Sequence, residues 1–287
     1  MTQDSGKCTL GLAEMMDSLT PREKRLARFI LDDPGAVVGM SIDELAETCH
    51  TSVSSVVRMC KHCGYSGFKE LCRMISGDLA SAGSAISYQD IRPGDSAPSV
   101  FRNICLSNMK AIENTMTMAD DGDIERAVKL LCEADRIDFY GSGTSALVAL
   151  DAHNKFLRTG KISMANADPH VQLLTAASLK KGDVAVLISY SGETYDILNL
   201  AEQLKETGCS IITITSYGKN SLRAYGDVQL CALSMETYIR SGAMSSRIAQ
   251  MTIIDALYGA VCSAMYAQVK PYLDKTRLAV GKTRPKN

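Results

Sequence analysis

The pattern of apolar and polar positions divides the chain into three zones. Up to about residue 78, apolar residues recur at helical spacing in short segments, without a strand pattern. A stretch rich in Gly, Ala, Ser and Pro follows, which is typical of a linker. Beyond it, a helical segment leads into strands that alternate with helices. The predicted parts are a small all-α head at 1–78, a linker at 79–99, a connecting helix at 100–124, an α/β domain at 125–268 and a basic tail at 269–287.

The predicted strands of the larger domain are short, nearly continuous apolar runs rich in β-branched residues. They lie at 136–140, 161–165, 183–189, 210–215 and 228–233, and helical patterns lie at 144–158, 170–179, 194–207 and 243–268. Such strands are buried on both faces, which predicts a parallel sheet covered by helices on each side. Parallel sheets bind ligands at the carboxyl ends of their strands. We therefore expect the site in the loops after residues 140 and 189.

Two short helices joined by a tight turn are predicted between residues 41 and 64. Ser41 and Glu44 have capping-box spacing, so the first helix begins there and runs through Thr48. Thr51 or Ser52 can cap the second helix, and Gly64 stands just past its end. The buried face of the second helix is predicted to hold Val53, Val56, Val57 and Cys60. This is the helix-turn-helix layout, although two amphipathic helices also occur in many other helical domains.

The opposite face of the second helix is polar and suits DNA. It is predicted to hold Ser52, Ser54, Ser55, Arg58, Met59 and His62. The first turns of a recognition helix reach base edges, so base reading is expected from Ser54, Ser55 and Arg58. Contacts to phosphates are expected from Thr51, Lys61, Tyr65 and Lys69.

The charge of the chain supports nucleic-acid binding only locally. The whole chain has a net charge of −1, and residues 1–78 hold nine basic and eleven acidic residues. Residues 51–73 contain four basic residues and one acidic residue, and residues 270–287 contain six basic residues and one acidic residue. Distribution matters more than the sum for a DNA-binding surface.

Two loops in the α/β domain have the composition of phosphate-binding turns. Gly141-Ser142-Gly143-Thr144-Ser145-Ala146 follows the first strand, and Ser189-Tyr190-Ser191-Gly192-Glu193-Thr194 follows the third. Each precedes a helix, whose free amides and positive dipole end favour an anion. The first loop also fits a dinucleotide fingerprint with Asp168, or an ordinary polar turn. The second hydroxyl-rich loop favours a compact phosphorylated sugar.

An enzyme of the sugar-phosphate isomerase type is the alternative function. Aldose–ketose isomerisation needs a general base, and the candidates are Glu193, Glu236, His153 and His170. None of them stands in a motif that carries catalysis. A nucleotide-cofactor-binding protein is a third, weaker interpretation.

Cysteine content and hydropathy narrow the class further. The ten cysteines favour reduced, buried thiols, and Cys60 and Cys63 lack the second pair that a zinc site would need. We therefore expect no metal and no cofactor. No apolar run approaches the roughly 18 residues of a membrane span, and the first residues lack a signal-peptide pattern. These features predict a cytoplasmic protein that does not enter the membrane.

Longer segments of the head resemble the N-terminal domain of RpiR/MurR-type transcriptional regulators. They are Leu19-Thr20-Pro21-Arg22-Glu23-Lys24, Met40-Ser41-Ile42-Asp43-Glu44-Leu45-Ala46, Ser54-Ser55-Val56-Val57-Arg58-Met59-Cys60-Lys61 and Gly64-Tyr65-Ser66-Gly67-Phe68-Lys69-Glu70-Leu71. The last segment is particularly specific. The resemblance implies a regulator that binds double-stranded operator DNA, and it makes Cys60 and Cys63 core thiols.

The two loops and their surroundings, over about 125–268, resemble the sugar isomerase (SIS) domain. This resemblance implies a five-stranded α/β/α sandwich that forms a homodimer or homotetramer and binds a phosphorylated sugar. The ligand residues it implies are Ser145, Ser189, Ser191 and Thr194, with Thr144 assisting. Ser142 and Tyr190 of the same loops are also expected to contact the ligand, and Arg240, Ser246 and Arg247 are expected in a following segment that closes over the sugar. The expected function is a regulator of carbohydrate catabolism genes whose operator binding the sugar modulates.

Overall fold

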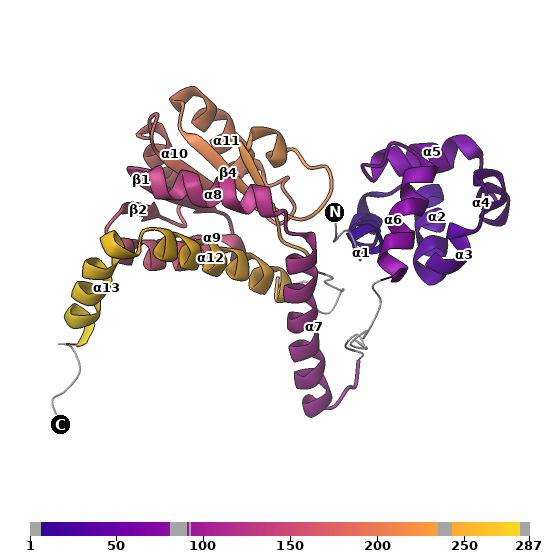
Figure 1. Ribbon diagram of the computed structural model, residues 1–287, viewed down its shortest axis with the longest axis horizontal. Helices are drawn as coiled ribbons and strands as arrows, with labels where there is room; N and C mark the ends of the chain where they lie inside the picture. Colours follow the sequence, from indigo (N-terminus) through magenta and orange to yellow (C-terminus); the bar gives the residue numbers. More distant parts are fainter. Residues whose placement is uncertain (1–6, 81–90, 92, 235–242, 282–287) are drawn as a thin grey trace. The chain divides into compact units, whose positions relative to one another are not determined.

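The computed structural model describes residues 7–80, 91, 93–234 and 243–281 (Figure 1). The chain divides into two compact units. The first comprises residues 1–118, 217–219 and 233–245, and the second comprises 119–216, 220–232 and 246–287. The head of the first unit is helical and the second unit carries the sheet, as the apolar pattern predicts.

The head is a bundle of short helices with its own core. Its elements are α1 (Lys7–Glu14), the 3-10 turn η1 (Met15–Ser18), α2 (Pro21–Asp32), α3 (Pro34–Val38), α4 (Ile42–Thr48), α5 (Val53–His62) and α6 (Phe68–Ala80). Capping boxes begin two of them, with Thr20 and Glu23 at α2 and Ser41 and Glu44 at α4. The fully buried core includes Leu12, Leu26, Ile30, Leu45, Val56, Met59, Leu71 and Ile75.

A 22-residue helix, α7 (Ala97–Met118), follows the head. It is shorter at its C-terminus than the connecting helix predicted over 100–124. A separate helix, α8 (Asp121–Glu133), begins after a break at which the Asp120 carboxylate accepts the Asp123 amide (2.9 Å). Both segments have helical periodicity, so the apolar pattern alone did not reveal the cap between them.

The second unit is built on a five-stranded parallel sheet, which confirms the predicted fold class. The strands are β1 (Arg136–Gly141), β2 (Ile162–Ala165), β3 (Val184–Ile188), β4 (Ser210–Thr215) and β5 (Val228–Cys231), in the order β2-β1-β3-β4-β5. Every residue of β3 is buried, as expected for a central strand covered on both faces.

Helices cover both faces of the sheet (Figure 1). On one face lie α9 (Thr144–Phe156), which the turn η2 (Leu157–Thr159) extends, and α12 (Ser245–Ala264). There the Phe156 ring lies 5.2 Å from that of Phe139 and 5.7 Å from that of Tyr258. On the other face, α10 (Pro169–Ala177) and α11 (Tyr195–Thr207) share a core with residues of β3 and β4. The turn η3 (Leu222–Tyr225) precedes β5.

The last predicted helix, 243–268, is two helices in the structure. After α12, α13 (Tyr266–Gly281) continues far into the residues predicted as a basic tail. Lys270 Nζ bonds Asp274 one turn along (2.7 Å), and the Tyr272 ring packs close to Gly160. The segment 269–287 was predicted from its charge alone, and its helical character, with Pro271 inside α13, was missed.

Candidate functional site

The loops after β1 and β3 leave the sheet side by side. These two strands pair directly, and Gly141 lies opposite Ile188 at their carboxyl ends. The chain then turns to α9 on one face and to α11 on the other. In this strand order the crevice between β1 and β3 is the topological switch point, where open α/β sheets bind ligands.

In the loop after β3, the predicted hydroxyl residues lie together. Ser189 is 3 % exposed, and its hydroxyl bonds that of Thr194 (3.0 Å) and accepts the Gly192 amide (3.2 Å). The hydroxyl of Ser191 accepts the Glu193 amide (3.2 Å). Gly192 has a φ of +67°, which favours glycine. The loop is therefore held by its own side chains in a tight turn before α11.

The loop after β1 is held by two glutamines that sequence reasoning missed. Ser145 is buried, and its hydroxyl lies 3.4 Å from the amide group of Gln250 on α12. Gln172 Nε2 donates to the carbonyls of Gly141 (2.8 Å) and Asn166 (2.6 Å). Ser142 and Thr144, the other predicted hydroxyl residues, are half-buried and exposed. A lone glutamine within a helical pattern gives no signal in one sequence.

The helices at the two loops begin without a side-chain cap, unlike the helix between them. Gly143 precedes α9 and Thr194 precedes α11, and neither makes a side-chain cap hydrogen bond. At α10, by contrast, the Asp168 carboxylate accepts the amides of His170 (2.8 Å) and Val171 (3.2 Å). Part of each first turn is satisfied by the backbone: the amides of Ser145 and Ala146 donate to the carbonyls of Ser142 (3.1 Å) and Gly143 (3.2 Å), and the Ile197 amide donates to that of Thr194 (3.1 Å). The positive dipole ends of the two helices, which no side chain caps, suit an external anion. Asp168 is occupied as a cap, which argues against the dinucleotide interpretation.

Two of the four candidate general bases, Glu193 and His153, have structural partners. Glu193 Oε1 accepts the amide of Ser221 (2.7 Å), which ties the β3 loop to the segment after β4. His153 Nδ1 lies 3.1 Å from the Ser163 hydroxyl, and burial lowers the pKa of His153. His170 is exposed at the start of α10. Glu236 and Arg240 lie outside the described residues, while Ser246 is buried and Arg247 half-buried.

The helix-turn-helix of the head forms as predicted. The Ser41 amide donates to the Glu44 carboxylate (2.7 Å), and Ser52 caps α5 by accepting the Ser55 amide (3.3 Å). Gly64, with a φ of +89°, follows the end of α5. The turn between α4 and α5 contains His50 at a positive φ of 49°.

The buried face of α5 differs from the prediction. Ser55, Val56, Met59 and Cys60 are its buried residues. Val53 is 36 % exposed and Val57 half-buried, so their placement in the core was wrong, as was the outward placement of Met59. The periodicity fits both faces about equally, and packing against α2 selects the one with Ser55, whose hydroxyl bonds Ser52 (2.9 Å).

The predicted DNA contacts divide by exposure. Ser52, Ser54, Arg58, Lys61 and Lys69 are exposed. Ser55 and Tyr65 are only 3 % and 8 % exposed, and the hydroxyl oxygen of half-buried Thr51 is buried without a hydrogen-bond partner among the described residues. Burial also raises the pKa of Tyr65. The exposed residues carry the candidate DNA surface.

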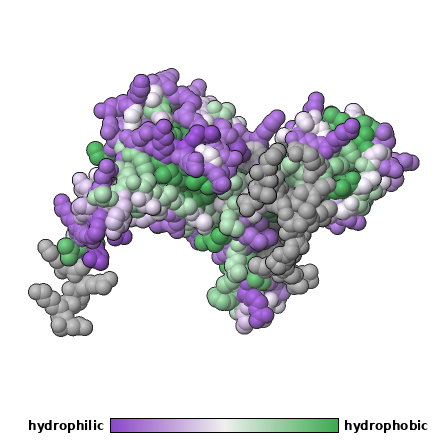
Figure 2. Space-filling view, viewed as in Figure 1, coloured by the Kyte–Doolittle hydropathy of each residue, from purple (hydrophilic) through white to green (hydrophobic). Residues whose placement is uncertain are grey.

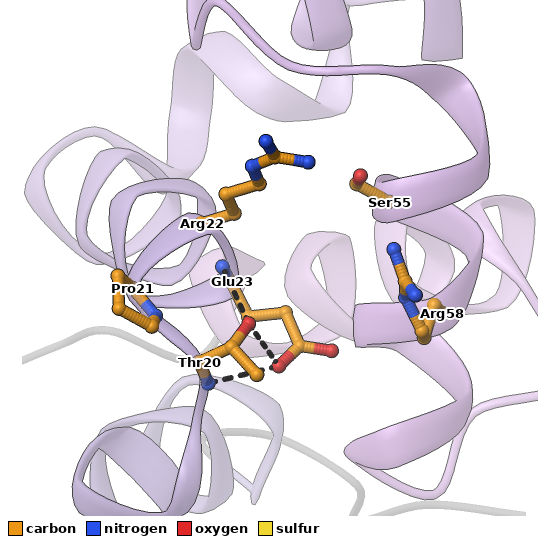
Figure 3. A pocket seen from close by; sticks show the side chains of 6 residues that line it. All are labelled: Thr20, Pro21, Arg22, Glu23, Ser55 and Arg58. Carbon is orange, nitrogen blue, oxygen red and sulfur yellow. Dashed lines mark hydrogen bonds between the residues drawn. The ribbon is translucent and has the colours of Figure 1, made fainter.

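A pocket of about 380 Å³ opens between the start of α2 and the side of α5. Figure 3 shows Arg22 of α2 facing Ser55 and Arg58 of α5 across it. Thr20, Pro21 and Glu23 complete the lining. The Thr20 amide (2.9 Å) and hydroxyl (2.7 Å) both donate to one oxygen of the Glu23 carboxylate, which partly offsets its charge. Arg22 is an additional candidate contact that the helical pattern did not single out.

Two family models match the two parts of the chain. The helix-turn-helix domain of the rpiR family matches residues 8–82, and the SIS domain matches residues 130–260. The HTH-type transcriptional regulator YbbH of Bacillus subtilis is 37 % identical over 97 % of this chain and 99 % of its own length. HexR of Pseudomonas aeruginosa, also an HTH-type transcriptional regulator, is 33 % identical over 94 % of both chains.

The chain belongs to the rpiR family of helix-turn-helix transcriptional regulators.

Solved structures agree on the fold of this rpiR-family protein. NanR of Vibrio vulnificus, in complex with ManNAc-6P, has a TM-score of 0.62 at 22 % identity, over 97 % of this chain and 100 % of that chain. The sugar isomerase domain of an RpiR transcription factor from Sphaerobacter thermophilus has a TM-score of 0.56 at 18 % identity. The match covers 64 % of this chain and 99 % of that chain. The fold of the SIS domain is also that of a protein from Listeria monocytogenes described as a putative sugar-phosphate isomerase (TM-score 0.54, 20 % identity), whereas the full-length relatives named above are regulators.

The thiols of the rpiR-family head are core residues. Burial, followed by neighbouring thiols, raises the pKa of Cys60 to about 12, and burial and Glu23 raise that of Cys63 to about 11. Over the described ranges, no group of three His, Cys, Asp or Glu side chains has a metal-binding arrangement. In the same residues, no single helix is long and apolar enough to cross a membrane. Only α12 and α13 taken together have the length and composition of a membrane span, and this pair is bent by 113°.

Proposed function

We propose that this rpiR-family regulator binds operator DNA through α5 and binds a phosphorylated sugar between the loops after β1 and β3. The sugar changes the affinity of the protein for its operator, which controls genes of carbohydrate catabolism. On this proposal the protein is a cytoplasmic sensor rather than an isomerase, and it acts as a homodimer or homotetramer on double-stranded DNA.

The observation that carries the sugar-phosphate proposal is the pair of uncapped helix starts at adjacent strand ends. Hydroxyls of Ser142, Thr144, Ser145, Ser189, Ser191 and Thr194, with Tyr190, surround these two helix starts in the sequence. A phosphate accepts several hydrogen bonds, and both backbone amides and hydroxyls can supply them. A ligand held by two loops is compact, which favours a sugar phosphate over a dinucleotide.

The exposed side of α5 supports the DNA proposal. Ser54 and Arg58 lie within the first two turns, where a recognition helix reaches base edges, and arginine can pair bidentately with guanine. Ser52, Lys61 and Lys69 are exposed for phosphates, and Arg22 adds a cation at the start of α2. The overall acidity of the head then matters little, because basic residues concentrate on this surface.

Ligand and DNA are coupled through different affinities for two arrangements of the protein. A ligand shifts such an equilibrium only by the ratio of its affinities for the two arrangements. The binding of ManNAc-6P by NanR suggests phosphorylated amino sugars as a first set of compounds to screen. Pentose phosphates and phosphorylated hexose acids belong in the same screen.

The test separates the two sites. Ser189→Ala combined with Ser191→Ala should abolish binding of the sugar phosphate found by a thermal-shift screen, as measured by calorimetry, and leave operator binding without ligand unchanged. Arg58→Ala should weaken operator binding in a gel-shift assay and leave sugar binding unchanged. Undiminished sugar affinity in the double variant would remove the pocket. Unchanged operator affinity in Arg58→Ala would remove the assignment of α5, and product formation from the bound sugar would favour the enzyme.

A further inference from the structure

The surface of α7 carries an apolar strip that faces water. From residue 99 to residue 118 the exposed residues are Phe101, Arg102, Cys105, Met109, Ile112 and Met116. Phe101 and Met116 are each 71 % exposed, and Met109 is 52 % exposed. Part of this surface is visible as green atoms along α7 in Figure 2. Arg102 is thus the only charged residue among the exposed positions of this stretch.

The buried side of α7 is largely polar. Of its five buried residues, Ser107, Asn114 and Thr115 are polar, and Ala111 and Met118 are apolar. Neither polar atom of the Asn114 side chain has a hydrogen-bond partner within the described part of the chain. A helix on a protein surface normally buries its apolar residues and exposes its polar ones. The strip therefore exposes apolar residues that the helix does not bury in the core of its own chain. Contiguous exposed apolar surface of this kind is typical of an interface.

The spacing of the strip is nearly the same in both directions. The five uncharged exposed residues are separated by 4, 4, 3 and 4 positions, and all lie within one narrow face of a helix with 3.6 residues per turn. If two copies of α7 ran antiparallel, with the midpoint beside Met109, Phe101 would meet Met116 of the partner subunit. Cys105 would then meet Ile112 of the partner subunit. A two-fold interface requires this self-complementarity, whereas packing against another part of the same chain does not.

The charges beside the strip are also complementary in this register. Arg102 and Glu113 lie on the same flank of the strip, because eleven residues are close to three helical turns. In an antiparallel pair, equal flanks face each other, so Arg102 lies within a turn of Glu113 of the partner subunit. Glu113 is half-exposed and already receives Lys110 Nζ (2.8 Å), and its carboxylate has room for a second donor. A parallel pair would give no such match.

We infer that the exposed strip of α7 pairs antiparallel with the same strip of a second copy of this chain. The inference does not depend on the identity of the sugar or of the operator. It adds a contact outside the SIS domain to the oligomer, on the helix that follows the linker from the head. Two heads would then be tethered to one helix pair.

The first test is oligomeric mass. Met109→Glu in the full-length chain should lower the oligomeric mass in sedimentation velocity, from tetramer to dimer or from dimer to monomer. Alternatively, it should raise the dissociation constant of the oligomer at least tenfold. Leu174→Glu, which places the same charge on an apolar residue of α10 that is 73 % exposed, should leave the mass unchanged. Arg102→Glu and Glu113→Arg should each weaken association, and their combination should restore it. An unchanged mass of folded Met109→Glu overturns the inference, as does a wild-type chain that is monomeric at all concentrations.

A cross-link tests the register independently. Within one helix, positions 105 and 112 are about 10.5 Å apart along the axis, too far for a disulfide. A disulfide between Cys105 and an introduced cysteine in Ile112→Cys must therefore join two chains. Mild oxidation should give this covalent dimer, and Cys105→Ser in the same background should abolish it. Wild-type dimers joined through Cys105 on both chains would indicate a parallel pair and overturn the antiparallel register.

Discussion

His62 Nδ1 lies 3.5 Å from Glu23 Oε2, and this contact joins the last turn of α5 to the first turn of α2. The Glu23 side chain is only 4 % exposed. Burial by itself would raise the pKa of Glu23, but hydrogen bonds from the Thr20 hydroxyl and amide, together with His62, outweigh it and lower that pKa. One carboxylate thus closes the capping box of α2 and also contacts α5, the helix proposed to read DNA.

The stability of the head should therefore fall in acid because of Glu23. Its folded pKa is lower than its unfolded pKa, so its contribution is complete above the unfolded value of about 4.3. That contribution is lost as the pH falls through the folded value. Glu23→Gln should lower the free energy of unfolding at neutral pH by about 1 kcal/mol and weaken its dependence on acid pH. Thermal unfolding followed by circular dichroism measures both. Exposed Glu47→Gln is the control, and an equal acid response in both variants would contradict the role of Glu23.

Arg22 should contact a phosphate, because it lines the pocket beside the recognition helix. Arg22→Ala should weaken binding to all sequences alike and reduce the slope of log K against log salt by about 1. Arg58→Ala should instead reduce the discrimination between operator and unrelated DNA by about 1–3 kcal/mol. Fluorescence anisotropy over a salt series separates the two. Arg28→Ala removes an exposed charge from the same helix outside the pocket and should change neither property.

Gly141 should tolerate no side chain. A Cβ atom there would lie 2.5 Å from the backbone oxygen of Ser145, where the β1 loop turns into α9. Gly141→Ala should lower the free energy of unfolding by about 1–3 kcal/mol and reduce affinity for the sugar phosphate. Gly259→Ala, in α12 with no atom within 4 Å of the new Cβ, should leave both unchanged or stabilise the fold slightly. Chemical denaturation and calorimetry report the two quantities, and wild-type ligand affinity in Gly141→Ala would show that this turn does not shape the pocket.

The head thiols should react slowly, and Cys105 should react quickly once the proposed α7 pair is separated. With pKa values of about 12 and about 11, Cys60 and Cys63 are almost entirely protonated at pH values near 8, and only the thiolate reacts. Cys105 is exposed on α7 of the single chain, where only the proposed pairing of two α7 helices would cover it. Iodoacetamide labelling of Met109→Glu, followed by peptide mass spectrometry, should therefore modify Cys105 first, and denaturant should make all ten cysteines reactive. Rapid labelling of Cys60 in the folded protein would contradict its placement in the core of the head.

The strands could be predicted closely because their signal is local. Each run of β-branched residues, such as 210–215, contains its own evidence of burial, and the loops at the strand ends follow from the sheet. The predicted hydroxyl residues of the β3 loop indeed lie together, with Ser189 bonded to Thr194. The family of the head could be predicted from its specific segments.

Features that depend on packing could not be predicted in this way. The face of α5 was wrong at Val53 and Val57, because contact with α2 buries the less apolar Ser55 instead. Three further residues contact segments far away in the sequence, and apolar periodicity gives no information on such contacts. They are Arg22, Gln172 and Gln250. The exposed strip of α7 was hidden for the same reason, since a helical pattern does not reveal which side another element covers.

The absence of side-chain caps at α9 and α11 has a consequence for how the proposed effector would work. At α10 the chain supplies its own terminating group, the carboxylate of Asp168. At the two flanking helices that group would be the phosphate of the sugar, a removable substitute for a residue. Metabolite concentration would then set how often these two helix starts carry a capping group. The supply of sugar would act directly on the stability of two helix ends.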